Sequence, residues 1–262
     1  MKTKLALVSV VLLLATAAVA QSSDDRQVLT QASQAYYSLR TQGMSTFQCD
    51  LTPDWNALLQ DQRQQNAAAA DAAVKILSQL HFVVSFGADD KVTITHNELT
   101  GQSQEMNTAL AQIYGGMEQM TSGFFDTWKL FMVNKPFPEA QSQFQLTTVG
   151  ALYTLHYVEN TADVYTTMSK DFAINQLSVT TSEFRSHIYP KFTKSVNGLL
   201  LSSYDADYDS DKPGEATRLN VAIGYQLVNG LEMLQKLELK GSYGGTPFAV
   251  LLSFQGCQVT KK

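Results

Sequence analysis

The chain has 262 residues, of which 16% are charged, and its 19 basic and 24 acidic side chains give a formal net charge of −5 at pH 7. This balance argues against nucleic acid or an anionic membrane as a partner, because no basic run or basic face is present to meet phosphates. Two cysteines without histidines beside them also exclude a structural zinc site.

Residues 1–20 have the layout of a cleavable secretory signal. Two lysines form a basic head, an apolar run follows from Leu5 to Ala18, and Ala18-Val19-Ala20 precede a cut before Gln21. The apolar run is too short to stay in a bilayer as a spanning helix, and no cysteine follows the cut to carry a lipid. Without the two lysines, 17 basic and 24 acidic side chains leave a net charge of −7. We expect an exported protein, periplasmic or extracellular, soluble after cleavage and without a stable membrane anchor, with one domain over residues 21–262.

The first half of this domain is mainly helical in pattern. Its expected elements are a helix over Asp24–Thr41, a strand over Phe47–Leu51, a helix over Asp54–Leu80, a hairpin of strands His81–Phe86 and Val92–Thr95, and a helix over Gln104–Val133. Gly43 ends the first helix, and Pro136 and Pro138 cut off the last one.

From Phe144 onward the apolar period changes to two, and turn signals recur about every ten residues, which predicts an antiparallel meander of roughly eight strands. Asn229-Gly230 predicts a tight hairpin between Leu219–Leu227 and Leu231–Leu239, because both residues tolerate positive φ. Asn197-Gly198 predicts a second such turn. Helices followed by a meander indicate an α+β fold.

Cys49 and Cys257 lie near opposite ends of the exported chain, where an oxidising compartment favours their pairing. A disulfide between them would close nearly the whole domain and stabilise it by about 4 to 5 kcal/mol in the chain-entropy picture. The alternative is two separately buried thiols.

The helix over residues 104–133 carries the most suggestive side chains. Methionines and aromatic residues recur there at spacings of three and four, as expected for one helical stripe that lines a cavity for an acyl chain. Gly115, Gly116 and Gly123 weaken this helix and suit a part that shifts. The candidate ligand-binding residues are Ile113, Met117, Met120, Phe124, Trp128 and Phe131. The alternative is that the stripe only packs the core.

No catalytic signature is present. His81, His96, His156 and His187 are scattered, and neither a Gly-x-Ser-x-Gly elbow nor a phosphate-binding glycine loop occurs. We therefore expect no catalytic residue, cofactor or metal. The acidic run Asp205–Asp211 could hold calcium, but it lacks the turn glycine and closing glutamate of a calcium loop. A solvated hairpin tip is the favoured interpretation of this run.

The order of elements resembles that of the LolA-like exported lipid- and lipoprotein-binding proteins. The resemblance lies in Tyr36-Tyr37-Ser38-Leu39, Gly43 and Phe47-Gln48-Cys49-Asp50-Leu51, and in the late strands Leu219–Tyr225, Leu231–Leu239 and Phe248–Phe254. It implies a strongly curved antiparallel sheet, an incomplete barrel of about 8–11 strands, with helices covering the concave face. It also implies a cavity for acyl chains and no catalysis. The helices expected over Asp54–Leu80 and after Gly101 make this chain larger than the simple carriers. None of the carriers' ligand-contacting residues can be placed on positions of this chain.

Three functions follow as hypotheses. The first is a non-enzymatic carrier or binding protein for a hydrophobic molecule, a lipid or lipoprotein acyl chain. The second is a structural or assembly protein of the cell envelope that binds another envelope protein. The third is an exported hydrolase with a triad built from distant residues. An outer-membrane barrel is set aside because helices interrupt the strand series.

Overall fold

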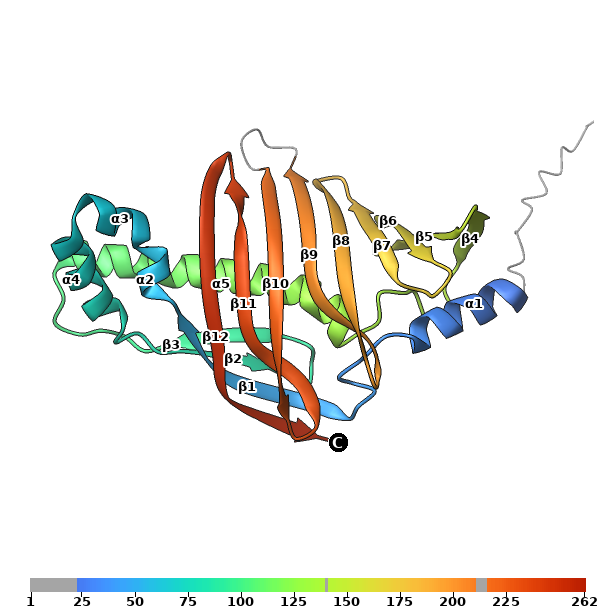
Figure 1. Ribbon diagram of the computed structural model, residues 1–262, viewed down its shortest axis with the longest axis horizontal. Coiled ribbons are helices and arrows are strands. Elements are labelled where there is room, and N and C mark those ends of the chain that lie inside the picture. Colours follow the sequence, from blue (N-terminus) through green and yellow to red (C-terminus); the bar gives the residue numbers. More distant parts are fainter. Residues whose placement is uncertain (1–22, 140, 211–215) are drawn as a thin grey trace, which may run out of the picture.

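The computed structural model describes residues 23–139, 141–210 and 216–262. Twelve strands in these residues form a single antiparallel sheet that does not close, with the order β3-β2-β1-β12-β11-β10-β9-β8-β7-β6-β5-β4. Five helices accompany it (Figure 1). The expected combination of an antiparallel sheet with helices is thereby confirmed. None of the helices in these ranges has both the length and the apolar character needed to cross a membrane.

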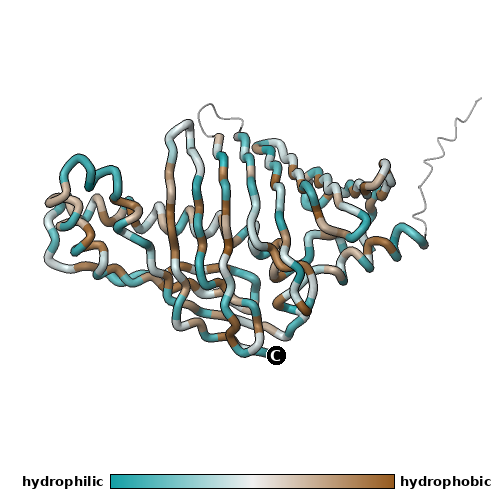
Figure 2. Tube along the Cα trace, viewed as in Figure 1, coloured by the Kyte–Doolittle hydropathy of each residue, from teal (hydrophilic) through white to brown (hydrophobic). Residues whose placement is uncertain are grey.

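Nine consecutive strands form the meander, one more than the sequence predicts. They are β4 (Phe144–Val149), β5 (Leu152–Glu159), β6 (Ala162–Ser169), β7 (Ile174–Thr180), β8 (Phe184–Ser195), β9 (Gly198–Ser210), β10 (Thr217–Val228), β11 (Leu231–Tyr243) and β12 (Thr246–Lys261). Asn229 and Gly230 have φ of 52° and 77°, which confirms the tight turn between β10 and β11. Figure 2 shows polar and apolar residues alternating along the long strands, as a sheet with one buried face requires.

The N-terminal strands extend this meander at its C-terminal edge. Strand β1 (Met44–Pro53) pairs with β12, and the hairpin of β2 (Phe82–Phe86) and β3 (Val92–His96) pairs with β1. Residues 44–53 and the C-terminal strand therefore lie side by side. Cys49 and Cys257 form a disulfide across this β1–β12 pair, as predicted, and link residues 208 positions apart.

The first helix ends earlier than the sequence predicts. Helix α1 covers Ser23–Gln34, and the expected continuation to Thr41 is wrong. Tyr36 instead bridges to Leu199 on β9, where Leu199 N donates to the Ala35 carbonyl and Tyr37 N donates to the Leu199 carbonyl. Gly198 permits this approach, because a Cβ there would lie 2.7 Å from the Ala35 carbonyl oxygen. A tertiary contact thus overrides the helical pattern.

The single helix expected over Asp54–Leu80 is also wrong. Three helices replace it: α2 (Trp55–Leu58), α3 (Gln60–Gln65) and α4 (Ala67–Leu77). The side chains of Asp54 and Asn66 accept hydrogen bonds from the backbone N–H groups of Ala57 and Ala69. Asn66 has extended φ and ψ of −152° and 92°, so the chain turns before α4 begins. Both are residue types that favour N-caps over helix interiors.

Helix α5 (Gln104–Met132) agrees with the expected long helix and crosses behind the strands of the sheet in Figure 1. An aromatic cluster attaches it to β1 and β12, the third and fourth strands from the β3 edge. The Phe125 ring lies 6.2 Å from that of Phe254, and Phe47 lies 6.0 Å from both Phe125 and Trp128. Such offset and edge-to-face pairs add to the stabilisation from burial alone.

A smaller cluster supports the far end of the sheet. Leu29 of α1 packs with Phe144, Leu155, Tyr157 and Val164 of β4, β5 and β6, and all five side chains are buried. Helix α1 therefore packs against the β4–β6 end of the sheet, near which it lies in Figure 1.

Candidate functional site

The six predicted ligand-binding side chains all lie on the side of α5 that faces the sheet. Phe124, Trp128 and Phe131 are at most 2% exposed, Met117 is buried, and Ile113 and Met120 pack at the border of the core. Ser103 starts the helix by accepting a hydrogen bond from Met106 N. The structure thus brings the six together, an arrangement that suits both core packing and ligand contact, so their binding role stays a prediction.

The C-terminal half of α5 reaches strands in the middle of the sheet. The Phe131 ring lies 5.8 Å from Phe192 on β8, and the Thr127 hydroxyl lies 3.2 Å from the Tyr208 hydroxyl on β9. The N-terminal half lies against the β3 edge, where Tyr114 stacks on His96 at 3.7 Å between ring centres. Helix α5 therefore spans the sheet from its β3 edge to β8.

Three polar atoms in this interior find no hydrogen-bond partner among the described residues. They are Thr121 Oγ1 and Trp128 Nε1 on α5, and the Tyr204 hydroxyl on β9. Each of these side chains is at most 1% exposed. The Trp128 indole lies beside the Tyr225 hydroxyl, and Thr127 lies beside the Tyr204 hydroxyl. Each neighbour partly offsets the rise that burial causes in the pKa of its tyrosine, although both pairs fall short of full hydrogen-bond geometry. Leaving such groups unpaired costs about 1–3 kcal/mol each.

The tyrosines around these atoms are neutral. Burial raises the pKa of Tyr204, Tyr208 and Tyr225, in each case as the largest effect. Tyr225 donates to the Leu201 carbonyl at 2.7 Å. With phenols held protonated, this interior offers hydrogen bonds and apolar contact but no general base.

We name this region the α5 interior and define it by Thr121, Thr127, Trp128, Tyr204, Tyr208 and Tyr225. Only Trp128 was among the predicted site residues. A signal for the two β9 tyrosines was present, because Tyr204 and Tyr208 alternate with the aspartates of the acidic run and must point to the opposite face. The hydroxyls of Thr121 and Thr127 carry no sequence signal that separates them from ordinary helix threonines.

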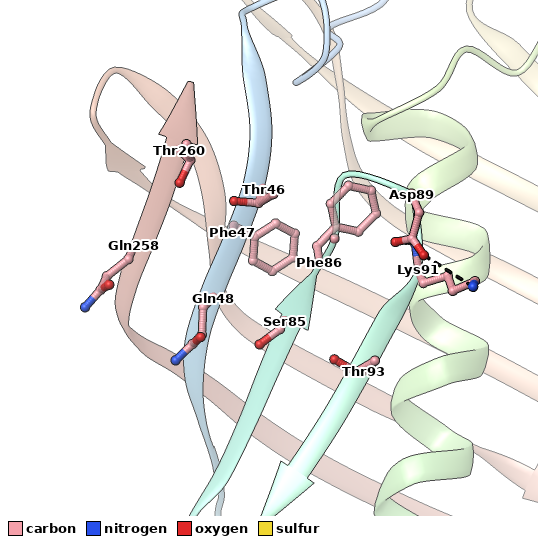
Figure 3. Close-up of a pocket in the computed structure, with 11 residues that line it drawn as sticks. Thr46, Phe47, Gln48, Ser85, Phe86, Asp89, Lys91, Thr93, Gln258 and Thr260 are labelled. Carbon is pink, nitrogen blue, oxygen red and sulfur yellow. Dashed lines mark hydrogen bonds and ion pairs between the residues drawn. The ribbon is translucent and has the colours of Figure 1, made fainter. Parts of the chain in front are cut away.

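Two hollows lie elsewhere on the molecule. The first, of about 360 Å³, lies over β12, β1, β2 and β3, where Figure 3 shows Gln48, Ser85 and Thr93 extending from neighbouring strands. The second, of about 330 Å³, lies between α1 and the segment of Lys135 and Pro138. Neither is lined by a predicted ligand-binding residue.

The acidic run lies on β9 as an exposed ladder of ion pairs. Asp205 binds Lys191 and Asn220, and the Asn220 hydrogen bond is the main reason that its pKa is lowered. Arg218 pairs with both Asp207 and Asp209. Asp211 lies outside the described residues, and in the remainder no three potential ligands gather to hold a metal ion.

Two histidines lie within hydrogen-bond reach of partners that a hydrolase would use. His187 Nδ1 is 2.8 Å from the Ser178 hydroxyl, and His156 Nε2 is 3.2 Å from Asp163. Neither pair borders either hollow. A hydrolase would need a substrate cleft beside one of these pairs, so this function stays a hypothesis.

Comparisons with protein-family models, with curated proteins and with solved structures find no match to this chain. The LolA-like resemblance therefore stays a proposal.

Proposed function

We propose that this protein is an exported, non-enzymatic carrier or binding protein that receives a hydrophobic molecule, such as the acyl chain of a lipid or lipoprotein, in the α5 interior. In this proposal α5 covers the concave face of a LolA-like incomplete barrel. The observation that carries it is the set of partnerless, buried polar atoms between α5 and the sheet. Native interiors contain few such groups, and each one calls for an explanation such as strain, a functional role or a bound water or ion.

The composition of the α5 interior supports a ligand of this class. It is rich in aromatic side chains, its polar groups are neutral, and the predicted stripe on the same helix adds methionines, as in sites for apolar molecules. Met117 and Met120 have flexible, unbranched side chains that adapt to different occupants.

The construction of α5 supports the entry of such a ligand. Gly115, Gly116 and Gly123 lie on its exposed side, and each lowers helix stability by about 1 kcal/mol relative to alanine. Separating α5 from the sheet also relieves the cost of the unpaired polar groups, which lowers the energy of an opened state.

Export is part of the proposal. The Cys49–Cys257 disulfide fits an oxidising compartment. It supports the signal interpretation of residues 1–20, which lie outside the described residues.

A lipid-extraction experiment tests the function. The protein is expressed with its own leader, purified without detergent, extracted with organic solvent and analysed by mass spectrometry. We expect co-purified acyl lipid at a near-stoichiometric ratio. The control is a variant with Met117, Met120 and Phe124 changed to glutamine, which should carry much less lipid once circular dichroism has shown that it is folded. A lipid-free wild-type protein that also takes up no lipid from vesicles would refute the proposal.

The envelope-assembly function has one specific observation in its favour. Strand β4 is an open sheet edge without a charged residue between Phe144 and Val149, and such edges can pair with another chain. The exposed apolar side chains near it do not form one patch, however. Val149 pairs with the start of β5 through Leu152, whereas Val158 lies at the other end of that strand. We therefore place this function second.

A further inference from the structure

The hollow of about 360 Å³ over β12, β1, β2 and β3 is lined mainly by side chains from the face of the sheet opposite the core (Figure 3). Successive side chains of a strand point to opposite faces. Phe47 and Phe86 are buried on the core side, whereas Gln48 and Thr93 are exposed. The hollow is therefore separate from the α5 interior, and its volume is in the range that holds a small molecule.

Four polar side chains form one row across the hollow. Gln48 is the register partner of Gln258 on β12 and of Ser85 on β2. Ser85 in turn pairs with Thr93 on β3. Neighbouring strands lie about 4.8 Å apart, so the row spans about 14 Å.

The polar side chains of the hollow have unused hydrogen-bonding capacity. Thr46 and Thr260 form a second outward pair, two residues from Gln48 and Gln258. Within the described part of the chain, neither these two threonines nor the four members of the row form a side-chain hydrogen bond to the protein. Each hydroxyl and each amide can both donate and accept. The hollow therefore presents six neutral groups of mixed donor and acceptor character.

The charges in the hollow are already paired. Asp89 and Lys91 are the only ionisable residues among the described residues that line it, and they pair with each other at 3.3 Å. An anion would find no free cation here, and a cation would find no free carboxylate. Phe47 and Phe86 also line the hollow but are at most 2% exposed, so they offer an apolar molecule little surface.

We propose that this hollow binds a neutral oligosaccharide. Every hydroxyl of such a ligand both donates and accepts hydrogen bonds, as do the groups that line the hollow. No unpaired charge has to leave water on binding. An extended peptide that adds a strand would need free backbone groups, but β12, β1 and β2 are each paired on both sides. The site does not depend on the acyl-chain function, because it uses the other face of the sheet.

Nuclear magnetic resonance of the side-chain amides of Gln48 and Gln258 tests the site in the isotope-labelled protein. Loss of a signal in Gln48→Leu or Gln258→Leu assigns each amide. The probes are three neutral trisaccharides, maltotriose, cellotriose and triacetylchitotriose, with trigalacturonate as the anionic comparison. At least one neutral probe should shift both signals along one saturation curve, with a dissociation constant of about 1 mM, as a few net hydrogen bonds allow. Trigalacturonate should bind at least about tenfold more weakly.

A matched pair of threonine variants tests the role of the row. Thr93→Val removes one hydroxyl with little change of shape, so it should weaken binding about three- to tenfold. Thr95→Val is the control, because Thr95 is exposed on the same face of β3 but does not line the hollow. It should leave the affinity unchanged. Both substitutions keep a β-branched side chain, which suits a strand.

Two kinds of result would overturn the proposal. The first is that none of the neutral trisaccharides shifts either amide signal at about ten times the expected dissociation constant. The second is that Thr93→Val and Thr95→Val weaken binding equally, or that trigalacturonate binds as tightly as the neutral probes. Neither result bears on the acyl-chain function, which lipid extraction measures separately.

Discussion

Replacing Cys49 and Cys257 together by alanine should lower the melting temperature by roughly 10–15 °C. The disulfide spans 208 residues, and closing a loop of that length is worth about 4 to 5 kcal/mol in the chain-entropy picture. For a domain of this size, each kcal/mol corresponds to about 2–4 °C. Differential scanning calorimetry of wild type and the double variant measures the change.

Reduction provides the control for this result. Dithiothreitol should lower the melting temperature of wild type to nearly that of the double variant, and it should leave the double variant unchanged. A double variant that melts within about 2 °C of wild type would contradict the view that the disulfide stabilises the fold by restricting the unfolded chain. It would show that residual pairing of β1 with β12 in the unfolded state already restricts that chain.

Phe125→Ala should destabilise the protein by about 3–5 kcal/mol. The Phe125 side chain is fully buried, and its ring lies edge-on to Trp128 and Phe254 at 5.5 and 6.2 Å. Removal of the ring leaves a cavity where α5 meets β1 and β12, and it removes the aromatic contacts that attach the helix to the sheet. Urea unfolding followed by circular dichroism gives the free energy of unfolding.

Phe184→Ala is the matched substitution for this experiment. Phe184 lies at the start of β8 and is 42% exposed, so its loss should cost less than about 1 kcal/mol. Equal losses for the two variants would mean that the aromatic cluster does not hold α5 in place.

Local patterns in the sequence predict much of this fold. The alternation after Phe144 indicates the meander, Asn229-Gly230 fixes one of its hairpins, and the spacing of apolar residues gives α5 nearly its full length. These features depend on residues close in the chain, where periodicity and turn chemistry act directly. The disulfide was also predicted, because the signal-like pattern of residues 1–20 and the count of two cysteines favour pairing over separately buried thiols.

Long-range contacts account for what the sequence did not predict. No local pattern shows that β1 pairs with β12, or that Tyr36 leaves a helical pattern to bridge to Leu199. The same holds for the candidate site. Trp128 is visible as part of a helical stripe, whereas Tyr204 and Tyr225 join it only because the meander places β9 and β10 under α5.

Tryptophan fluorescence tests the central claim, that a hydrophobic ligand enters the α5 interior, most directly. The chain contains two tryptophans, Trp55 and Trp128, so Trp55→Phe leaves Trp128 as the single reporter and Trp128→Phe leaves Trp55. Each variant is titrated with methyl palmitate brominated at carbons 9 and 10, because bromine quenches indole fluorescence at close range. The proposal predicts saturable quenching of Trp128 and little quenching of Trp55. Unquenched Trp128 fluorescence in a folded protein, at ligand concentrations that saturate uptake, would contradict it.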